Sequence, residues 1–117
     1  MAGSLRRGSI VLAIYPFTDL SSTKRRPALV VSATRRTDTD YILAFITSRT
    51  DRSDETDLVL ENSDADFART GLHASSAIRC GKLMTLDRTL LTGSLGQLSE
   101  GLMREVDQRL RRALELT

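Results

Sequence analysis

Short apolar blocks separated by polar turns run along most of the chain, and this pattern predicts a mainly β fold. The first block, Ile10–Tyr15, is a run of apolar residues bounded by Gly8 and Pro16, which is typical of a strand buried on both faces. Further strands are expected at Pro27 to about Ser32, Tyr41–Thr47, around Asp57–Leu60, and Ser76–Met84. Because only a polar turn separates the second strand from the third, these two are expected to pair as a hairpin.

The last of these strands contains Gly81, which favours a bulge or a close approach of another backbone. Alternation along this strand places Ile78, Cys80 and Met84 on one face and Arg79 on the other.

The hydrophobic period changes near the C-terminus, where the pattern predicts a helix. The apolar positions form the stripe of a surface helix that lies on a core: Leu102, Val106, Leu110, Ala113 and Leu114. Ser99 is the expected N-cap, and Glu100 follows it at the positive end of the helix dipole. Arginines at positions 109, 111 and 112 fall in the last turns, where cations complement that dipole, so a structural role is favoured for them over contact with nucleic acid.

Length and cysteine content limit the architecture further. At 117 residues the chain is expected to form a single domain, residues 1–117, with a core of its own. Cys80 is the only cysteine, so an internal disulfide is excluded, and the single His73 has no partner at metal-ligand spacing. No apolar run approaches the about 20 residues of a membrane helix, and the N-terminus lacks a signal-peptide core. We therefore expect a cytoplasmic protein that needs no metal, cofactor or membrane.

Basic residues gather in small clusters, although the net charge is only +2. Lys24, Arg25 and Arg26 stand directly before Pro27, and the proline favours an extended backbone at Arg26. The Arg26 guanidinium is thereby expected at the rim of the sheet, where its planar fork of donors suits a phosphate. The polar segment of residues 17–26 is expected to be a loop over this surface. The clusters point to nucleic acid, and on the residues alone an ordinary solvated strand flank stays open.

The order of these segments resembles the MazF/PemK family of type II toxin–antitoxin ribonucleases. The resemblance covers residues 6 to about 116, and its matching pieces are residues 7–12, 16–20, 26–32, 46–48, 78–87 and 95–98. It implies a compact SH3-like β-barrel with a C-terminal helix, acting as a homodimer.

The same resemblance implies a metal-independent endoribonuclease that acts on single-stranded RNA. The 2′-OH attacks the adjacent phosphate, which leaves a 2′,3′-cyclic phosphate and a 5′-OH. This reaction needs charge stabilisation at the phosphate, a proton acceptor and a proton donor. Arg26 corresponds to the family's arginine before proline, which is assigned to phosphate stabilisation, with acid–base work as an alternative role. Thr47 corresponds to the hydroxyl residue that binds the scissile phosphate, with Ser48 beside it. Arg79 corresponds to a second arginine used by the PemK branch, which is assigned a role at the scissile phosphate or its leaving oxygen.

Two carboxylate positions of the family hold other residues in this chain. The PemK branch has an aspartate two residues after the second arginine, where this chain has Gly81, and other members have a glutamate before the arginine–proline pair, where this chain has Ser21. Asp19, in the same loop, is the nearest substitute for the proton acceptor. Its alternative role is that of a turn residue that satisfies local backbone donors.

The remaining polar and aromatic residues receive lesser roles. Phe17 is expected either to stack on an unpaired base or to pin its loop to the barrel. Lys24 and Arg25 are expected to contact RNA. His73 has no counterpart among the family's catalytic residues, and Cys80 is expected to be a buried, inert thiol.

The expected partners are single-stranded RNA, a second copy of the chain and a cognate antitoxin. Such an antitoxin is a small acidic segment, which the basic clusters would attract. Two other functions stay open: a CcdB-like toxin that binds gyrase and cuts nothing, and a degenerate member that binds only RNA or an antitoxin.

Overall fold

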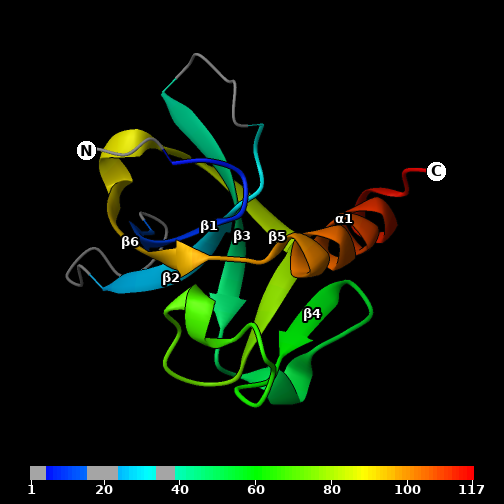
Figure 1. The fold of residues 1–117 in the computed structure, drawn as a ribbon. Helices are drawn as coiled ribbons and strands as arrows, with labels where there is room; N and C mark the ends of the chain where they lie inside the picture. Colours follow the sequence, from blue (N-terminus) through cyan, green and yellow to red (C-terminus); the bar gives the residue numbers. More distant parts are fainter. Residues whose placement is uncertain (1–4, 16–23, 34–38) are drawn as a thin grey trace.

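The computed structural model describes residues 5–15, 24–33 and 39–117. These residues form a curled sheet with a helix after it (Figure 1). The sheet has the order β4-β5-β3-β2-β1-β6, and every pairing in it is antiparallel. The strands are β1 (Ser9–Ile14), β2 (Arg25–Val30), β3 (Asp40–Thr47), β4 (Asp57–Leu60), β5 (Ser76–Asp87) and β6 (Leu91–Gln97).

In the described residues the helix is α1 (Glu100–Leu114), and three short 3₁₀ turns lie between strands: η1 (Thr50–Arg52), η2 (Ala68–Thr70) and η3 (Arg88–Leu90). The mainly β fold with a C-terminal helix is confirmed. The sheet is curled but open, with β4 and β6 as its edges. Within the described residues, no helix is long and apolar enough to cross a membrane.

Two apolar clusters lie on opposite faces of the strands. The helix core joins one face to α1 and consists of Ile10, Leu29, Ala44, Ile46, Leu58, Leu60, Ile78, Cys80, Leu98, Leu102 and Val106. The second core lies on the other face and consists of Val11, Ala13, Tyr15, Ala28, Val30, Leu43 and Leu86. Neighbouring residues along β1 and β2 enter different cores because successive side chains of a strand point to opposite faces. The prediction that the first strand is buried on both faces is therefore confirmed.

The second strand begins earlier than the sequence pattern predicts. The predicted hairpin of β2 and β3 is present, but β2 spans Arg25–Val30, so Pro27 is its third residue and Ser32 lies beyond it. Proline is tolerated there because β2 pairs with β3 only from Ala28 onward, while its first residues pair with β1 alone. Arg25 and Arg26 consequently belong to the strand and not to the preceding loop.

The bulge predicted at Gly81 is confirmed, and it places Met84 on the face of the sheet opposite to the expected one. Phe45 of β3 pairs with Arg79, whereas the adjacent Ala44 pairs with Leu83, so three residues of β5 have no counterpart in β3. After this insertion the alternation changes phase. Met84 therefore packs against the second core and not on the face of Ile78 and Cys80. The strand also continues to Asp87, beyond its predicted end.

Helix α1 begins as its sequence predicts, and its first turns pack on the core as expected. The Ser99 hydroxyl accepts a hydrogen bond from the backbone N–H of Leu102 at 3.2 Å, which satisfies one of the free donors of the first turn. Leu102 and Val106 are buried in the helix core. Leu114 is 53% exposed, so the predicted apolar stripe is wrong at its end, where the helix extends away from the sheet (Figure 1).

The sequence pattern does not predict β6. This strand carries Gly93 and Gly96 and few apolar residues, a composition that weakens a strand. It forms because the backbone groups along the edge of β1 pair with it. Ser9 pairs with Gln97 and Ala13 with Leu91, and the register shifts at two places between these pairs.

Candidate functional site

Strand register brings three of the predicted site residues to one face of the sheet. Directly paired residues of antiparallel strands share a face, and so do residues two apart on one strand. Ala28 pairs with Phe45, and Phe45 pairs with Arg79. Arg26 lies two residues before Ala28, and Thr47 lies two residues after Phe45. Extending the pairing of Ala28 with Phe45 by two residues places Arg26 opposite Thr47 on the same face. We call the surface that carries Arg26, Thr47 and Arg79 the site face.

Aromatic rings lie beside Arg26 on the site face. The rings of Tyr15 and Phe45 are in contact, with centroids 4.4 Å apart, and the Tyr15 hydroxyl donates to the carbonyl of Pro27 at 3.3 Å. Burial raises the pKa of Tyr15, while the positive charge of Arg26 acts in the opposite direction. The Nζ atom of Lys82 lies 6.0 Å from the Phe45 centroid. The exposed guanidinium of Arg26 thus lies near an aromatic pair made of the buried Tyr15 and the half-buried Phe45, and the ammonium of Lys82 lies over the Phe45 ring.

Thr47 ends β3 with its hydroxyl already oriented. Its Oγ1 accepts a hydrogen bond from the backbone N–H of Arg49 at 3.1 Å. A hydroxyl that accepts one bond keeps its proton, so Thr47 can still donate to a ligand. Ser48 follows it as an exposed residue outside the strand. Arg49 pairs with Asp51 through Nε and Oδ1 at 3.3 Å.

A carboxylate that no motif in the sequence marks lies beside Arg79. Asp57 begins β4 directly across from Arg79, and its Oδ2 is 3.5 Å from the Arg79 Nε atom. Its side chain is 2% exposed, whereas that of Arg79 is 28% exposed. In the sequence, Asp57 is one of many acidic residues in a charged stretch, and only the strand register identifies its partner.

The other predicted residues are dispersed or fall outside the described part of the chain. Arg25 is exposed and alternates with Arg26, so it belongs to the opposite face of β2. Lys24 is exposed just before the strand. Phe17, Asp19 and Ser21 lie outside the described residues, and the roles expected for Phe17 and Asp19 stay predictions.

The arginines of α1 bind backbone carbonyls near β4. Arg109 donates through Nε to the carbonyl of Asp57 at 3.2 Å, and Arg112 donates through Nη1 to the carbonyl of Glu55 at 3.4 Å. These contacts support the structural role favoured for this basic cluster. His73 is exposed in the segment between η2 and β5.

Cys80 is completely buried in the helix core, as predicted. Burial raises the pKa of its thiol to about 11, and the nearby charge of Asp57 adds to this increase. Because thiolate is the reactive form, we expect the native thiol to react with a disulfide reagent at pH 8 far more slowly than the unfolded chain does.

The raised pKa of the Cys80 thiol also predicts how stability depends on pH. The unfolded thiol ionises near pH 8.5, so between that pH and about 11 the unfolded state binds fewer protons than the native state. Stability should therefore fall as pH rises through this range. Urea denaturation of the protein and of Cys80→Ala at several pH values between 8 and 11 tests this. If the free energy of unfolding falls equally with pH in both proteins, the prediction is wrong.

Taken together, the site face carries two guanidinium groups, an ammonium and a hydroxyl donor. Fixed cations and donors on one surface suit a phosphodiester, because they bind its oxygens and stabilise charge that develops on them. In the described part of the chain, no group of three or more His, Cys, Asp and Glu residues is arranged to hold a metal.

Comparison with known protein families identifies the family of the chain. The family described as PemK-like, MazF-like toxin of type II toxin-antitoxin system matches residues 6–114. The chain belongs to this toxin family. No curated protein matches the sequence of this MazF-like toxin.

Solved structures share the fold of the MazF-like toxin over nearly its whole length. An endoribonuclease from Mycobacterial species is 22% identical, with a TM-score of 0.73, and the match covers 97% of this chain and 94% of that one. The Mycobacterium tuberculosis toxin MazF-mt6 is 22% identical, with a TM-score of 0.75, over 93% of this chain and 98% of the other. A MazE-MazF structure from Deinococcus radiodurans matches at 20% identity and a TM-score of 0.75, covering 99% and 100% of the two chains. The matches agree with the architecture described above.

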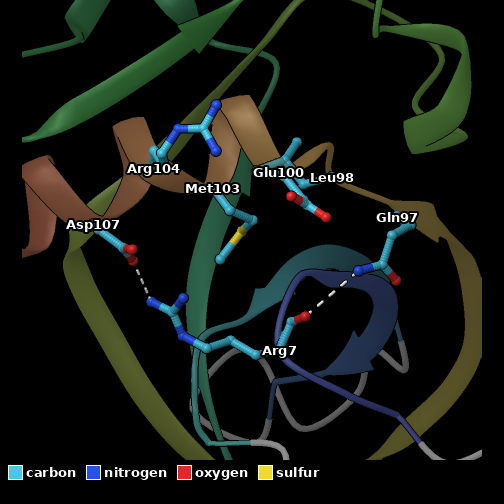
Figure 2. A pocket seen from close by; sticks show the side chains of 7 residues that line it. All are labelled: Arg7, Gln97, Leu98, Glu100, Met103, Arg104 and Asp107. Atoms are coloured by element: carbon cyan, nitrogen blue, oxygen red, sulfur yellow. Dashed lines mark hydrogen bonds and ion pairs between the residues drawn. The ribbon is translucent and has the colours of Figure 1, made fainter.

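The MazF-like toxin also has an open hollow of about 330 Å³ beside the start of α1, lined by both charged and apolar side chains. Figure 2 shows that Arg7 and Asp107 form an ion pair across it and that the Gln97 amide contacts the backbone carbonyl of Arg7. Arg7 also donates through Nε to the carbonyl of Val31 at 3.0 Å. The contacts of Arg7 with Asp107, Gln97 and Val31 therefore hold the segment before β1 against α1, which indicates a structural role for Arg7.

Proposed function

We propose that this type II toxin is an endoribonuclease that cleaves single-stranded RNA without a metal ion. The observation that carries the proposal is the convergence of Arg26, Thr47 and Arg79 on one face of the sheet. Family membership and structural neighbours that include endoribonucleases support it.

In the proposed reaction, the 2′-OH of one nucleotide attacks the phosphorus of the adjacent phosphodiester. The O–P bond to the 5′-oxygen of the next nucleotide breaks as the new bond forms, which gives a 2′,3′-cyclic phosphate and a 5′-OH. Negative charge grows on the phosphoryl oxygens in the transition state. Arg26 and Arg79 supply positive charge there, and Thr47 donates a hydrogen bond.

Proton transfer completes the proposed mechanism. The attacking hydroxyl loses a proton, and the leaving 5′-oxygen gains one, so an acceptor and a donor are both required. Asp19 is the proposed acceptor of the 2′-OH proton on sequence grounds, and water supplies the proton that the leaving 5′-oxygen gains beside Arg79. Ser48 assists Thr47 at the phosphate. Lys24 and Arg25 are proposed to bind RNA beyond the scissile bond, and Phe17 to stack on a base.

The proposed setting is the cytoplasm, where the toxin acts as a homodimer under the control of an antitoxin. The structural neighbours include an endoribonuclease with its cognate antitoxin and MazE-MazF structures. An acidic antitoxin segment would compete with RNA for the cations of the site face.

The proposed function predicts discrete cleavage of a mixed-sequence single-stranded RNA by purified protein in excess EDTA. The 5′ ends should accept labelled phosphate from a kinase without prior phosphatase treatment, and the 3′ ends should carry the cyclic phosphate. An RNA with a 2′-O-methyl group at a mapped cleavage site should resist cutting there, since it lacks the attacking hydroxyl. Cleavage that requires added Mg²⁺, or leaves 5′-phosphates, would contradict the mechanism. If no cleavage occurs but gyrase supercoiling is inhibited, the protein is a gyrase-binding toxin.

A further inference from the structure

Asp57 is a buried carboxylate whose contacts leave one oxygen unsatisfied. Oδ2 accepts the backbone N–H of Asp54 at 3.1 Å and lies 3.5 Å from the Arg79 Nε atom. Oδ1 is buried and has no hydrogen-bond partner among the described residues. A carboxylate removed from water is costly unless a cation and donors compensate it. Asp57 therefore depends on Arg79 for its charge partner.

The backbone around Asp57 is fixed from several sides. The Asp57 N–H donates to the Asp54 carbonyl at 3.0 Å, and Arg109 of α1 binds the Asp57 carbonyl at 3.2 Å. In the same turn, Asp54 Oδ1 accepts hydrogen bonds from Thr56 N at 2.8 Å and from Thr56 Oγ1 at 2.7 Å. The flexible Arg79 side chain therefore has an ion-pair partner whose position is fixed.

This turn also occupies the space next to Gly81. A Cβ atom built on Gly81 would lie 2.9 Å from the Thr56 Oγ1 atom, closer than van der Waals contact allows. A side chain at position 81 would therefore displace Thr56 and disturb its bonds to Asp54. A carboxylate beside Arg79 comes instead from Asp57 on the neighbouring strand.

We propose that Asp57 is a positioning residue that fixes the Arg79 guanidinium on the site face. The ion pair runs through the Arg79 Nε atom, which leaves the two terminal nitrogens to bind phosphate oxygens. Burial of Asp57 behind Arg79 keeps the carboxylate away from RNA, so it acts through the arginine and not on the substrate. This inference rests on the proposed ribonuclease function.

A double-mutant cycle tests the proposal. Asp57→Asn keeps the shape of the side chain and an oxygen for the Asp54 N–H but removes the charge. We expect it to lower kcat for RNA cleavage about 10-fold and to change KM little, because positioning matters most in the transition state. In an Arg79→Ala background, Asp57→Asn should cause no further loss of kcat. The matched control is Asp51→Asn, which breaks an exposed ion pair in the same segment and should leave kcat unchanged.

Thermal unfolding of each variant separates positioning from folding. In the Arg79→Ala background the Asp57 carboxylate has lost its charge partner, so Asp57→Asn should destabilise the protein less there than in the unmodified protein. Each kcat is therefore measured at a temperature where the unfolding curve shows that the variant is fully folded, so that a loss of kcat in Asp57→Asn reports positioning and not unfolding. Equal losses of kcat in both backgrounds would overturn the proposal, as would unchanged kcat in the single variant.

A spectroscopic readout tests positioning even if the protein cuts no RNA. The Arg79 Nε–H signal in a ¹H–¹⁵N spectrum, assigned by its absence in Arg79→Lys, should be sharp and slowly exchanging in the unmodified protein. It should broaden or exchange faster in Asp57→Asn and stay unchanged in Asp51→Asn. An Nε–H signal that is equally mobile in all three proteins would overturn the proposal, whereas failure of the ribonuclease function is detected by the EDTA assay.

Discussion

Replacing Arg26 by alanine is expected to reduce RNA cleavage about 100-fold or more, because removing one donor to a developing oxyanion has an effect of this size. Arg26 is exposed, and within the described part of the chain no hydrogen bond or ion pair holds its guanidinium. The free energy of unfolding should therefore change little. Single-turnover cleavage in EDTA measures the first effect, and urea denaturation measures the second.

Two arginine variants give this experiment its controls. Arg25→Ala changes the adjacent residue on the opposite face of β2 and should affect KM without lowering kcat. Arg111→Ala removes an exposed charge from the last turns of α1 and should leave cleavage intact. Cleavage that survives in Arg26→Ala at the level of Arg111→Ala would show that Arg26 does not act at the phosphate, or that a contaminating nuclease cuts the RNA.

Gly96→Ala is expected to destabilise the protein by about 3 kcal/mol or more, since overpacking against backbone cannot be relieved by a side-chain rotation. A Cβ atom on Gly96 would lie 2.2 Å from the carbonyl oxygen of Arg69 and 2.7 Å from that of Thr70. The strand β6 and the turn η2 would have to separate. Urea denaturation, followed by circular dichroism, measures the loss.

Gly93 of the same strand supplies the matched control. A Cβ atom there meets no other atom within 4 Å, so Gly93→Ala should be neutral or slightly stabilising, as expected where alanine replaces glycine in a strand. Equal stabilities of the two variants would show that β6 and η2 are not packed as closely as the structure has them.

The local elements were predictable where short-range chemistry decides them. The N-cap at Ser99 follows from a hydroxyl before an apolar stripe, and its bond to the Leu102 N–H is observed. The burial of Cys80 follows from its place in an alternating strand. By contrast, the start of β2 before Pro27 depends on where β3 ceases to pair with it, and Met84 changes face because of a bulge whose position depends on β3.

The candidate site was likewise predictable only in part. Arg26, Thr47 and Arg79 were identified in the sequence through the resemblance to a toxin family, but their common face follows from strand register. Asp57 was not identified, because an aspartate in a charged stretch has no local signal that marks it as buried. Its role depends on the strand directly across from it, where Arg79 stands.

The sequence by itself determined the mainly β class, the hairpin of β2 and β3, the C-terminal helix and the family to which the chain is similar, because periodicity, capping and motif order are properties of neighbouring residues. The tertiary structure alone decided that β6 pairs with the edge of β1, that the sheet separates two cores, and that a buried carboxylate lies behind Arg79. These features depend on contacts between strands distant in the chain, and only the register of the folded sheet determines which residues meet.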